Sequence, residues 1–215
     1  MNGGSDGGRA GHEFRPSFVY FDLDDTLLDH SEAERAALRD LACDLLGLDG
    51  DPAAIARLQE TYHERNRKLW ADYASGRIKK DELRRSRFQP VAGTLGHGKS
   101  WSELDSFFMA RYADHWRPID GAMEVFEDVS ARYPVGIITN GFADTQHAKL
   151  GRFPLFREVA HAVVISEEVG YLKPDPRLFA EAEERAGVPG ESILYVGDSL
   201  SSDVRGALGA GWRAA

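Results

Sequence analysis

Cysteine is almost absent from this sequence, since Cys43 is the only one among 215 residues. A single cysteine cannot form an internal disulfide, which is typical of a protein in a reducing compartment. Leu41, Leu45 and Leu46 surround it. We therefore interpret Cys43 as a small apolar side chain on a helix and not as a reactive thiol.

Long apolar runs are also absent. No stretch reaches the roughly 18 apolar residues that can cross a bilayer, so we expect no membrane span. Residues 1–16 are polar and glycine-rich and contain no apolar segment, which excludes a secretory signal. We interpret residues 1–16 as a flexible leader and expect the protein to be cytoplasmic.

Positive charge is in deficit. The sequence has 26 Lys and Arg against 35 Asp and Glu, which gives a formal net charge of -9. Domains that bind nucleic acid usually have the opposite balance, so we expect no nucleic acid polymer as a partner. The histidines include no pair at H-x-x-x-H spacing, so a zinc site of that kind is not predicted. The sequence does not indicate an oligomeric state.

Short apolar runs alternate with helical patterns in the second half of the sequence. One run occupies residues 17–22, near the start, and others occupy 135–139, 162–166 and 193–197. Strands that alternate with helices are typical of βαβ units in a parallel sheet. We therefore predict an α/β fold with a Rossmann-like parallel sheet.

The segment from 31 to 115 interrupts this alternation with apolar residues at helical spacing. Ser31-x-x-Glu34 and Ser100-x-x-Glu103 are possible capping boxes at the starts of two helices. We predict that residues 31–115 form an inserted α-helical cap domain. The catalytic core then consists of residues 17–30 and 116–215.

Polar residues follow the predicted strands at four places. They are Asp22-Leu-Asp24-Asp-Thr26, Thr139-Asn140, Lys173-Pro-Asp175-Pro and Gly197-Asp198-x-x-x-x-Asp203. The carboxyl ends of parallel strands form the ligand crevice of an open α/β sheet. We therefore expect all four groups to converge at one site.

The convergence would bring four carboxylates near a single lysine. Two like charges about 4 Å apart repel by about 4 kcal/mol at an effective dielectric constant near 20, so Lys173 alone cannot compensate for them. Oxygen ligands without clustered His or Cys favour Mg²⁺. Mg²⁺ is thus the predicted cofactor.

The arrangement also allows two carboxylates to divide the work of phosphoryl transfer. Of Asp22 and Asp24, one would attack phosphorus, and the other would protonate the leaving alkoxide and later deprotonate water. Thr139 and Lys173 would hold the phosphoryl oxygens. Asn140 would either support the loop around Asp22 or contact phosphate.

These motifs, in this order, closely resemble those of the haloacid dehalogenase superfamily, and the resemblance spans residues 18 to about 212. It implies that Asp22 is the nucleophile. It implies that Asp24 is the general acid/base and gives a backbone carbonyl to Mg²⁺. Dehalogenases and phosphonatases of the superfamily lack an aspartate at the position of Asp24, so its presence favours a phosphatase.

The same resemblance implies the remaining roles. Thr139 and Lys173 correspond to the phosphate binders, and Asp198 to a metal ligand. Asp203 would bind the metal directly or support Asp198. The superfamily also carries a further strand after Gly-Ala-Gly, whereas this sequence ends at Ala215, so we expect that edge of the sheet to be incomplete.

Several segments resemble the bacterial pyrimidine 5'-nucleotidase branch more closely. These are residues 20–28, 136–142 and 165–170, with part of the predicted cap over 66–88. The resemblance predicts a small-molecule phosphate ester as substrate, and first a nucleoside 5'-monophosphate. A sugar phosphatase or phosphoglycolate-type phosphatase is the alternative, and a phosphoacceptor signalling domain is the alternative from another class.

Residues 65–87 carry nine cations and three anions, an excess of +6. The simplest explanation of this excess of cations is that they lie on solvated helix faces. The functional interpretation is a cap that attracts anions to the site. Within this region we predict that Trp70, Arg87 and Phe88 select the leaving group, with hydrophobic packing as the alternative for the two rings.

Overall fold

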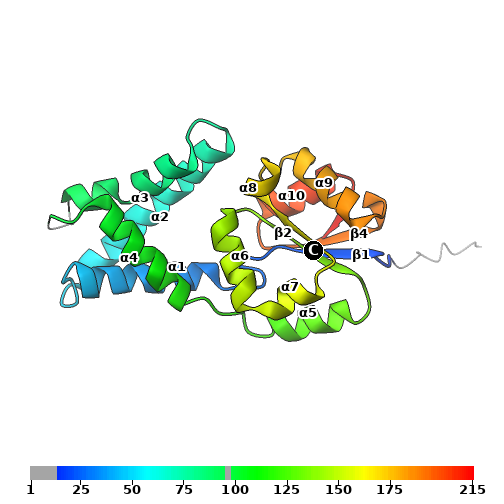
Figure 1. The fold of residues 1–215 in the computed structure, drawn as a ribbon, viewed down its shortest axis with the longest axis horizontal. Helices are drawn as coiled ribbons and strands as arrows, with labels where there is room; N and C mark the ends of the chain where they lie inside the picture. The colour runs from blue at the N-terminus through cyan, green and yellow to red at the C-terminus, as the bar shows by residue number, and fades with distance from the viewer. Residues whose placement is uncertain (1–13, 95–97) are drawn as a thin grey trace, which may run out of the picture.

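The computed structural model describes residues 14–94 and 98–215, so most of the predicted leader lies outside the described residues. The chain forms a sheet covered by helices on both faces and a group of four helices beside it (Figure 1). In the part of the chain that is described, no helix is long and apolar enough to cross a membrane.

The sheet is fully parallel and has the strand order β3-β2-β1-β4-β5. Its strands are β1 (Phe18–Phe21), β2 (Val135–Thr139), β3 (Ala162–Ile165), β4 (Ile193–Val196) and β5 (Arg213–Ala214). The first strand is central, with Phe21 opposite Ile137 on one side and Val196 on the other. The α/β prediction is confirmed. The edge expected to be incomplete is occupied by the two-residue strand β5.

Strand β1 is buried on both faces because its side chains alternate between two hydrophobic clusters. Phe18 and Tyr20 pack on one face of the sheet, and Val19 and Phe21 pack on the other. This is why the sequence shows a continuous apolar run instead of an alternating one.

Helices cover both faces of the sheet (Figure 1). The cluster of Val19 and Phe21 includes residues of α5 (Ala122–Ser130), α6 (Ala143–Arg152) and α7 (Pro154–Val159). The cluster of Phe18 and Tyr20 includes residues of α9 (Pro176–Ala186) and α10 (Arg205–Gly209), with α8 (Ser166–Val169) against it. Short turns lie at Gly190–Ser192 and Leu200–Val204. Helix α7 was not predicted.

The four remaining helices pack around a hydrophobic core of their own. They are α1 (His30–Asp40), α2 (Pro52–Ala74), α3 (Lys80–Thr94) and α4 (Trp101–Asp114), and a π-helical turn at Leu41–Leu45 follows α1. We call them the helical lobe. The core of the lobe includes Leu38, Leu58, Phe88 and Phe108.

The starts of these helices test the predicted caps. The capping box of Ser100 and Glu103 is present in full at the start of α4. The box predicted at Ser31 is wrong, because α1 begins at His30 and the side chain of Asp29 accepts the hydrogen bond from the Glu32 N–H. The Ser31 hydroxyl instead donates to Asp25 Oδ2.

Candidate active site

A cavity of about 330 Å³ lies between the carboxyl ends of the strands and the helical lobe. The side chains that line it from the strand ends include Asp22, Asp24, Lys173, Asp198 and Asp203. The helical lobe contributes others, among them His30, Trp70, Arg87 and Tyr112. The four predicted groups therefore meet at the cavity, although Thr139 is fully buried and is not among the described residues that line it.

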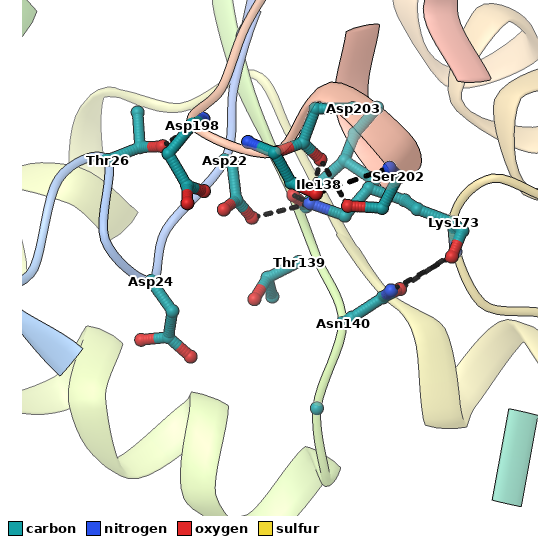
Figure 2. Close-up of polar contacts among 12 residues, drawn as sticks. Asp22, Asp24, Thr26, Ile138, Thr139, Asn140, Lys173, Asp198, Ser202 and Asp203 are labelled. Atoms are coloured by element: carbon teal, nitrogen blue, oxygen red, sulfur yellow. Dashed lines mark hydrogen bonds and ion pairs between the residues drawn. The ribbon is translucent and has the colours of Figure 1, made fainter. Parts of the chain in front are cut away.

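Asp22 follows β1 directly and is buried beside Lys173, with 2.6 Å between Asp22 Oδ1 and Lys173 Nζ. The Lys173 ammonium also contacts the Tyr195 hydroxyl at 2.9 Å and Asp203 Oδ1 at 2.7 Å (Figure 2). Burial raises the pKa of Asp22 to about 7, against the opposing effect of Lys173. Burial tends to lower the pKa of Lys173, but Asp22 and Asp203 more than compensate and raise it.

Three carboxylates form a group that could hold a divalent cation. One oxygen each from Asp22, Asp198 and Asp203 lies within 4.8 Å of the others. Burial and then the charge of Asp203 raise the pKa of Asp198. Hard oxygen donors of this kind fit Mg²⁺. A Cβ at Gly197 would lie 2.6 Å from Asp203 Oδ2, so the approach of Asp203 requires glycine there.

The turn after β1 separates Asp24 from this group. Asp25 has a positive φ of 59°, and its side chain accepts hydrogen bonds from the N–H and hydroxyl of Ser31. Thr26 accepts a hydrogen bond from the Asp198 N–H at 3.1 Å, which joins the turn to the loop after β4. Asp25 thus shapes the turn.

Asp24 points toward helix α6 and not toward Asp22 (Figure 2). Lys149 Nζ lies 2.6 and 2.8 Å from its two oxygens, and Gln146 Nε2 donates to Oδ2 at 2.9 Å. Burial alone would raise the pKa of Asp24, but the charges of Lys149 and His30 outweigh burial and lower it. Among the described residues, its carboxylate is outside the three-carboxylate group. The predicted metal contact through its backbone carbonyl stays a prediction.

Neither Lys149 nor Gln146 was predicted from the sequence. Both lie on the buried face of α6 together with Leu150. The available signal was their spacing in an amphipathic helix. Gln146 and Lys149 are polar residues three positions apart, and they share a helix face with the apolar Leu150.

Thr139 and Asn140 follow β2. Thr139 is fully buried, and its Oγ1 accepts a hydrogen bond from Gln146 Nε2 at 3.1 Å. Asn140 binds the backbone of Lys173 twice, since its Nδ2 donates to the Lys173 carbonyl at 3.1 Å and its Oδ1 accepts from the Lys173 N–H at 2.8 Å (Figure 2). These bonds hold the loop that carries Lys173, which neither predicted alternative named, and both support of the loop around Asp22 and phosphate contact by Asn140 stay predictions.

The three predicted lobe residues have different surroundings. Trp70 lines the cavity and stacks on Phe142, with 4.9 Å between ring centroids. Arg87 also lines it, but it is buried and pairs with Asp105 at 3.1 Å. Phe88 is fully buried in the core of the helical lobe and is not among the described residues that line the cavity, so the structure does not bring it to the site. Its packing alternative is the one the structure supports.

The parallel α/β sheet thus brings three carboxylates and a buried lysine together at its strand ends. Residues 18–211 match the family model for haloacid dehalogenase-like hydrolases. The chain therefore belongs to this family, as the sequence motifs predicted.

Similar curated proteins include phosphatases. Pyrimidine 5'-nucleotidase YjjG from Escherichia coli (strain K12) is 33% identical over 195 residues, which are 90% of this chain and 82% of that protein. Glyceraldehyde 3-phosphate phosphatase from Methanopyrus kandleri is 34% identical over 200 residues, with 90% and 80% covered. The chain is an enzyme of this hydrolase family, and these relatives are consistent with phosphoric monoester hydrolysis.

Solved structures agree on the fold. The crystal structure of the HAD-hydrolase YfnB from Bacillus subtilis, bound to magnesium, matches with a TM-score of 0.78 and 29% identity. The match covers 93% of this chain and 87% of that one. L-2-haloacid dehalogenase from Xanthobacter autotrophicus, with a TM-score of 0.70 and 22% identity, shares the fold.

Proposed function

We propose that this protein is a Mg²⁺-dependent phosphatase that hydrolyses a small phosphate monoester through an aspartyl-phosphate on Asp22. The observation that carries the proposal is the position of the Asp22 carboxylate. It lies at the end of the central strand and lines the cavity, 2.6 Å from the Lys173 ammonium and within 4.8 Å of oxygens of Asp198 and Asp203.

In the first half of the reaction, a carboxylate oxygen of Asp22 forms a bond to phosphorus while the bond from phosphorus to the leaving oxygen breaks. Asp24, whose pKa the ion pair with Lys149 lowers, first takes up a proton from solvent and then gives it to that oxygen as the alcohol leaves. Lys173 stabilises the charge of the phosphoryl oxygens, and Thr139 supplies a hydroxyl beside them. Asn140 holds the loop that carries Lys173.

In the second half, Asp24 takes a proton from water while the water oxygen bonds to phosphorus. The bond from phosphorus to Asp22 breaks, which restores the carboxylate and yields inorganic phosphate. Asp22, Asp198 and Asp203 would hold the Mg²⁺ ion, and Asp24 would add its backbone carbonyl. When bound, the ion offsets the negative charge that these carboxylates and the phosphoryl group share.

The helical lobe over residues 31–115 is the proposed cap. Because it contributes part of the cavity lining, the leaving group would contact it while the phosphoryl group contacts the core. A phosphoacceptor signalling domain would not need such a lobe or an acid/base. A phosphoenzyme lifetime of seconds or less would support the phosphatase, and one of minutes would support the signalling domain. The predicted cytoplasmic location stays a prediction.

For the substrate we favour a nucleoside 5'-monophosphate, with a pyrimidine base first. The cavity volume lies in the range of sites for drug-sized ligands, and it presents the aromatic ring of Trp70 and the cations Lys80 and Arg84 toward a leaving group. Two relatives are named pyrimidine 5'-nucleotidases. Relatives named glyceraldehyde 3-phosphate phosphatases keep a sugar or short acid phosphate as the second candidate.

The test is a panel of phosphate esters assayed with Mg²⁺, with Trp70→Ala beside the unaltered enzyme. We expect Trp70→Ala to lower kcat/KM for a nucleotide by about 10-fold, the scale of one lost stacking contact of 1–3 kcal/mol, and to change it little for p-nitrophenyl phosphate. Trp101→Ala is the matched control, since Trp101 lies on α4 in the described lobe but away from the cavity lining. Better turnover of glycolate or sugar phosphates than of nucleotides would favour the second candidate.

A further inference from the structure

Lys149 is a buried cation that the four motifs do not include. It lies on α6, its side chain is 2% exposed, and its ammonium contacts both oxygens of Asp24. On the other side it faces the rings of Tyr112 and Trp116, at 5.1 and 5.8 Å from the ring centroids. A buried ion pair often stabilises a fold no better than apolar residues of similar size. The pair with Asp24 is therefore the feature that a role for this lysine has to explain.

Gln146 lies one turn before Lys149 and contacts the same carboxylate. Its Nε2 lies 2.9 Å from Asp24 Oδ2, 3.1 Å from Thr139 Oγ1 and 3.2 Å from the Asn140 carbonyl. A Cβ at Gly141 would collide with this amide. The loop after β2 thus leaves room for Gln146 to reach Asp24.

Three donor contacts from two successive turns of α6 fix the direction of the Asp24 carboxylate. An aspartate side chain has only two rotatable bonds, so contacts to both oxygens leave it little freedom. Asp24 is turned away from Asp22 and lies on the α6 side of the cavity (Figure 2). In an in-line displacement, the leaving oxygen departs on the side opposite the nucleophile.

We propose that Lys149 is a positioning residue that holds the Asp24 carboxylate on the leaving-group side of the cavity. Gln146 assists it. The inference rests on the proposed function, because it assigns Lys149 to the step in which Asp24 gives its proton to the leaving oxygen. Tyr112 and Trp116 hold the ammonium from the side of the helical lobe.

The test compares Lys149→Met with Lys149→Arg on two esters. The ester p-nitrophenyl phosphate releases a stable anion and needs no acid, whereas an alkyl phosphate such as a nucleoside 5'-monophosphate does. Because kcat/KM covers the steps up to release of the alcohol, it isolates the use of the acid. We expect Lys149→Met to lower kcat/KM for the alkyl ester by about 10-fold to 100-fold, which does not exceed the rate enhancement that general acid catalysis typically provides. For the aryl ester we expect kcat/KM to fall by less than about 3-fold. Lys149→Arg should recover part of the loss.

Two further measurements separate positioning from packing. In the Asp24→Asn background, Lys149→Met should cause no additional loss on the alkyl ester, since the lysine acts through Asp24. Arg157→Met is the matched control, on the neighbouring helix α7 with an exposed side chain, and it should leave both esters unaffected. Equal loss on both esters, or additive loss in the double variant, would overturn the positioning role.

The proposed function is tested separately from the role of Lys149. If the unaltered enzyme hydrolyses both esters and Asp24→Asn loses activity mainly on the alkyl ester, the proposed function stands regardless of the result with Lys149→Met. If the unaltered enzyme hydrolyses neither, both fail.

Discussion

Asp22 combines burial with charged neighbours, which makes its protonation sensitive to folding. Burial raises its pKa from 3.8 to about 7 in the metal-free protein. A raised pKa means that the folded state binds the proton more tightly than the unfolded state does. The contribution of Asp22 to stability is therefore fully present below about pH 4 and is lost as the pH rises through about 7.

Asp22→Asn removes this titration. We expect the melting temperature of the variant, measured in excess chelator, to fall less between pH 5 and pH 8 than that of the unaltered protein. At pH 8 the variant should be the more stable of the two, because Asp203 and Asp198 lose a repelling neighbour. Thermal unfolding followed by circular dichroism at the two pH values checks this. Parallel dependence of the two melting temperatures on pH would contradict it.

The sequence predicted the side chains at strand ends better than those on helices. Asp22, Lys173 and Asp203 follow from the motifs and the parallel sheet, and they meet as expected. Lys149 and Gln146 could not be assigned, because a helical pattern does not say what lies opposite its buried face. Contact with Asp24 depends on how the turn at Asp25 directs that side chain.

In strand β2, Gly136 is closely packed, which allows a prediction about the stability of the fold. Gly136 pairs with Tyr20 across the sheet, and a Cβ there would collide with the Tyr20 ring and lie 2.9 Å from the Ala162 carbonyl. Tyr20 cannot easily move, because it stacks on Trp212 and its hydroxyl donates to the Ala182 carbonyl at 2.7 Å.

Gly136→Ala should therefore destabilise the fold by about 1–3 kcal/mol, the usual cost of overpacking a core. In a chain of this length, each kcal/mol lowers the melting temperature by roughly 2–4 °C. Gly151→Ala is the matched control, since nothing lies within 4 Å of a Cβ in that helical position. It should leave stability unchanged or raise it. Equal melting temperatures for the two variants would show that the contact at Gly136 has no cost.

The existence of most helices and strands followed from periodicity, whereas their ends did not. The start of α4 was predicted because both partners of the capping box lie within four residues. The start of α1 was not, because Asp29 and Ser31 are both good caps, and only the bond from Ser31 to Asp25 decides between them.

At the scale of the whole molecule, the helical lobe contacts the core on the side of the cavity formed by α2 and α3. Phe142 of the core packs against Trp70 and Tyr73 of α2. Lys80 at the start of α3 pairs with Glu167 at 3.3 Å and Asp144 at 3.2 Å. The sequence could not predict this contact, because the resemblance of separate segments does not say which of their side chains meet.

The carboxylate group predicts how the molecule responds to a divalent cation. Exhaustive chelation should abolish phosphatase activity, and Mg²⁺ should restore it, while Ca²⁺ should restore little because its coordination is larger and looser. Mg²⁺ should also raise the melting temperature of the chelated protein, since a ligand that binds only the folded state stabilises it. Asp198→Asn should reduce that rise. Full activity after chelation would rule out the metal requirement.

The central claim is that Asp22 carries the phosphoryl group. The most direct measurement is acid quenching within the first turnover on a phosphate ester, followed by mass spectrometry and peptide mapping. We predict one phosphoryl group per chain, located on Asp22, with neither phosphoprotein nor turnover in Asp22→Asn. A phosphoryl group on another residue, or an Asp22→Asn variant with full activity, would contradict the account.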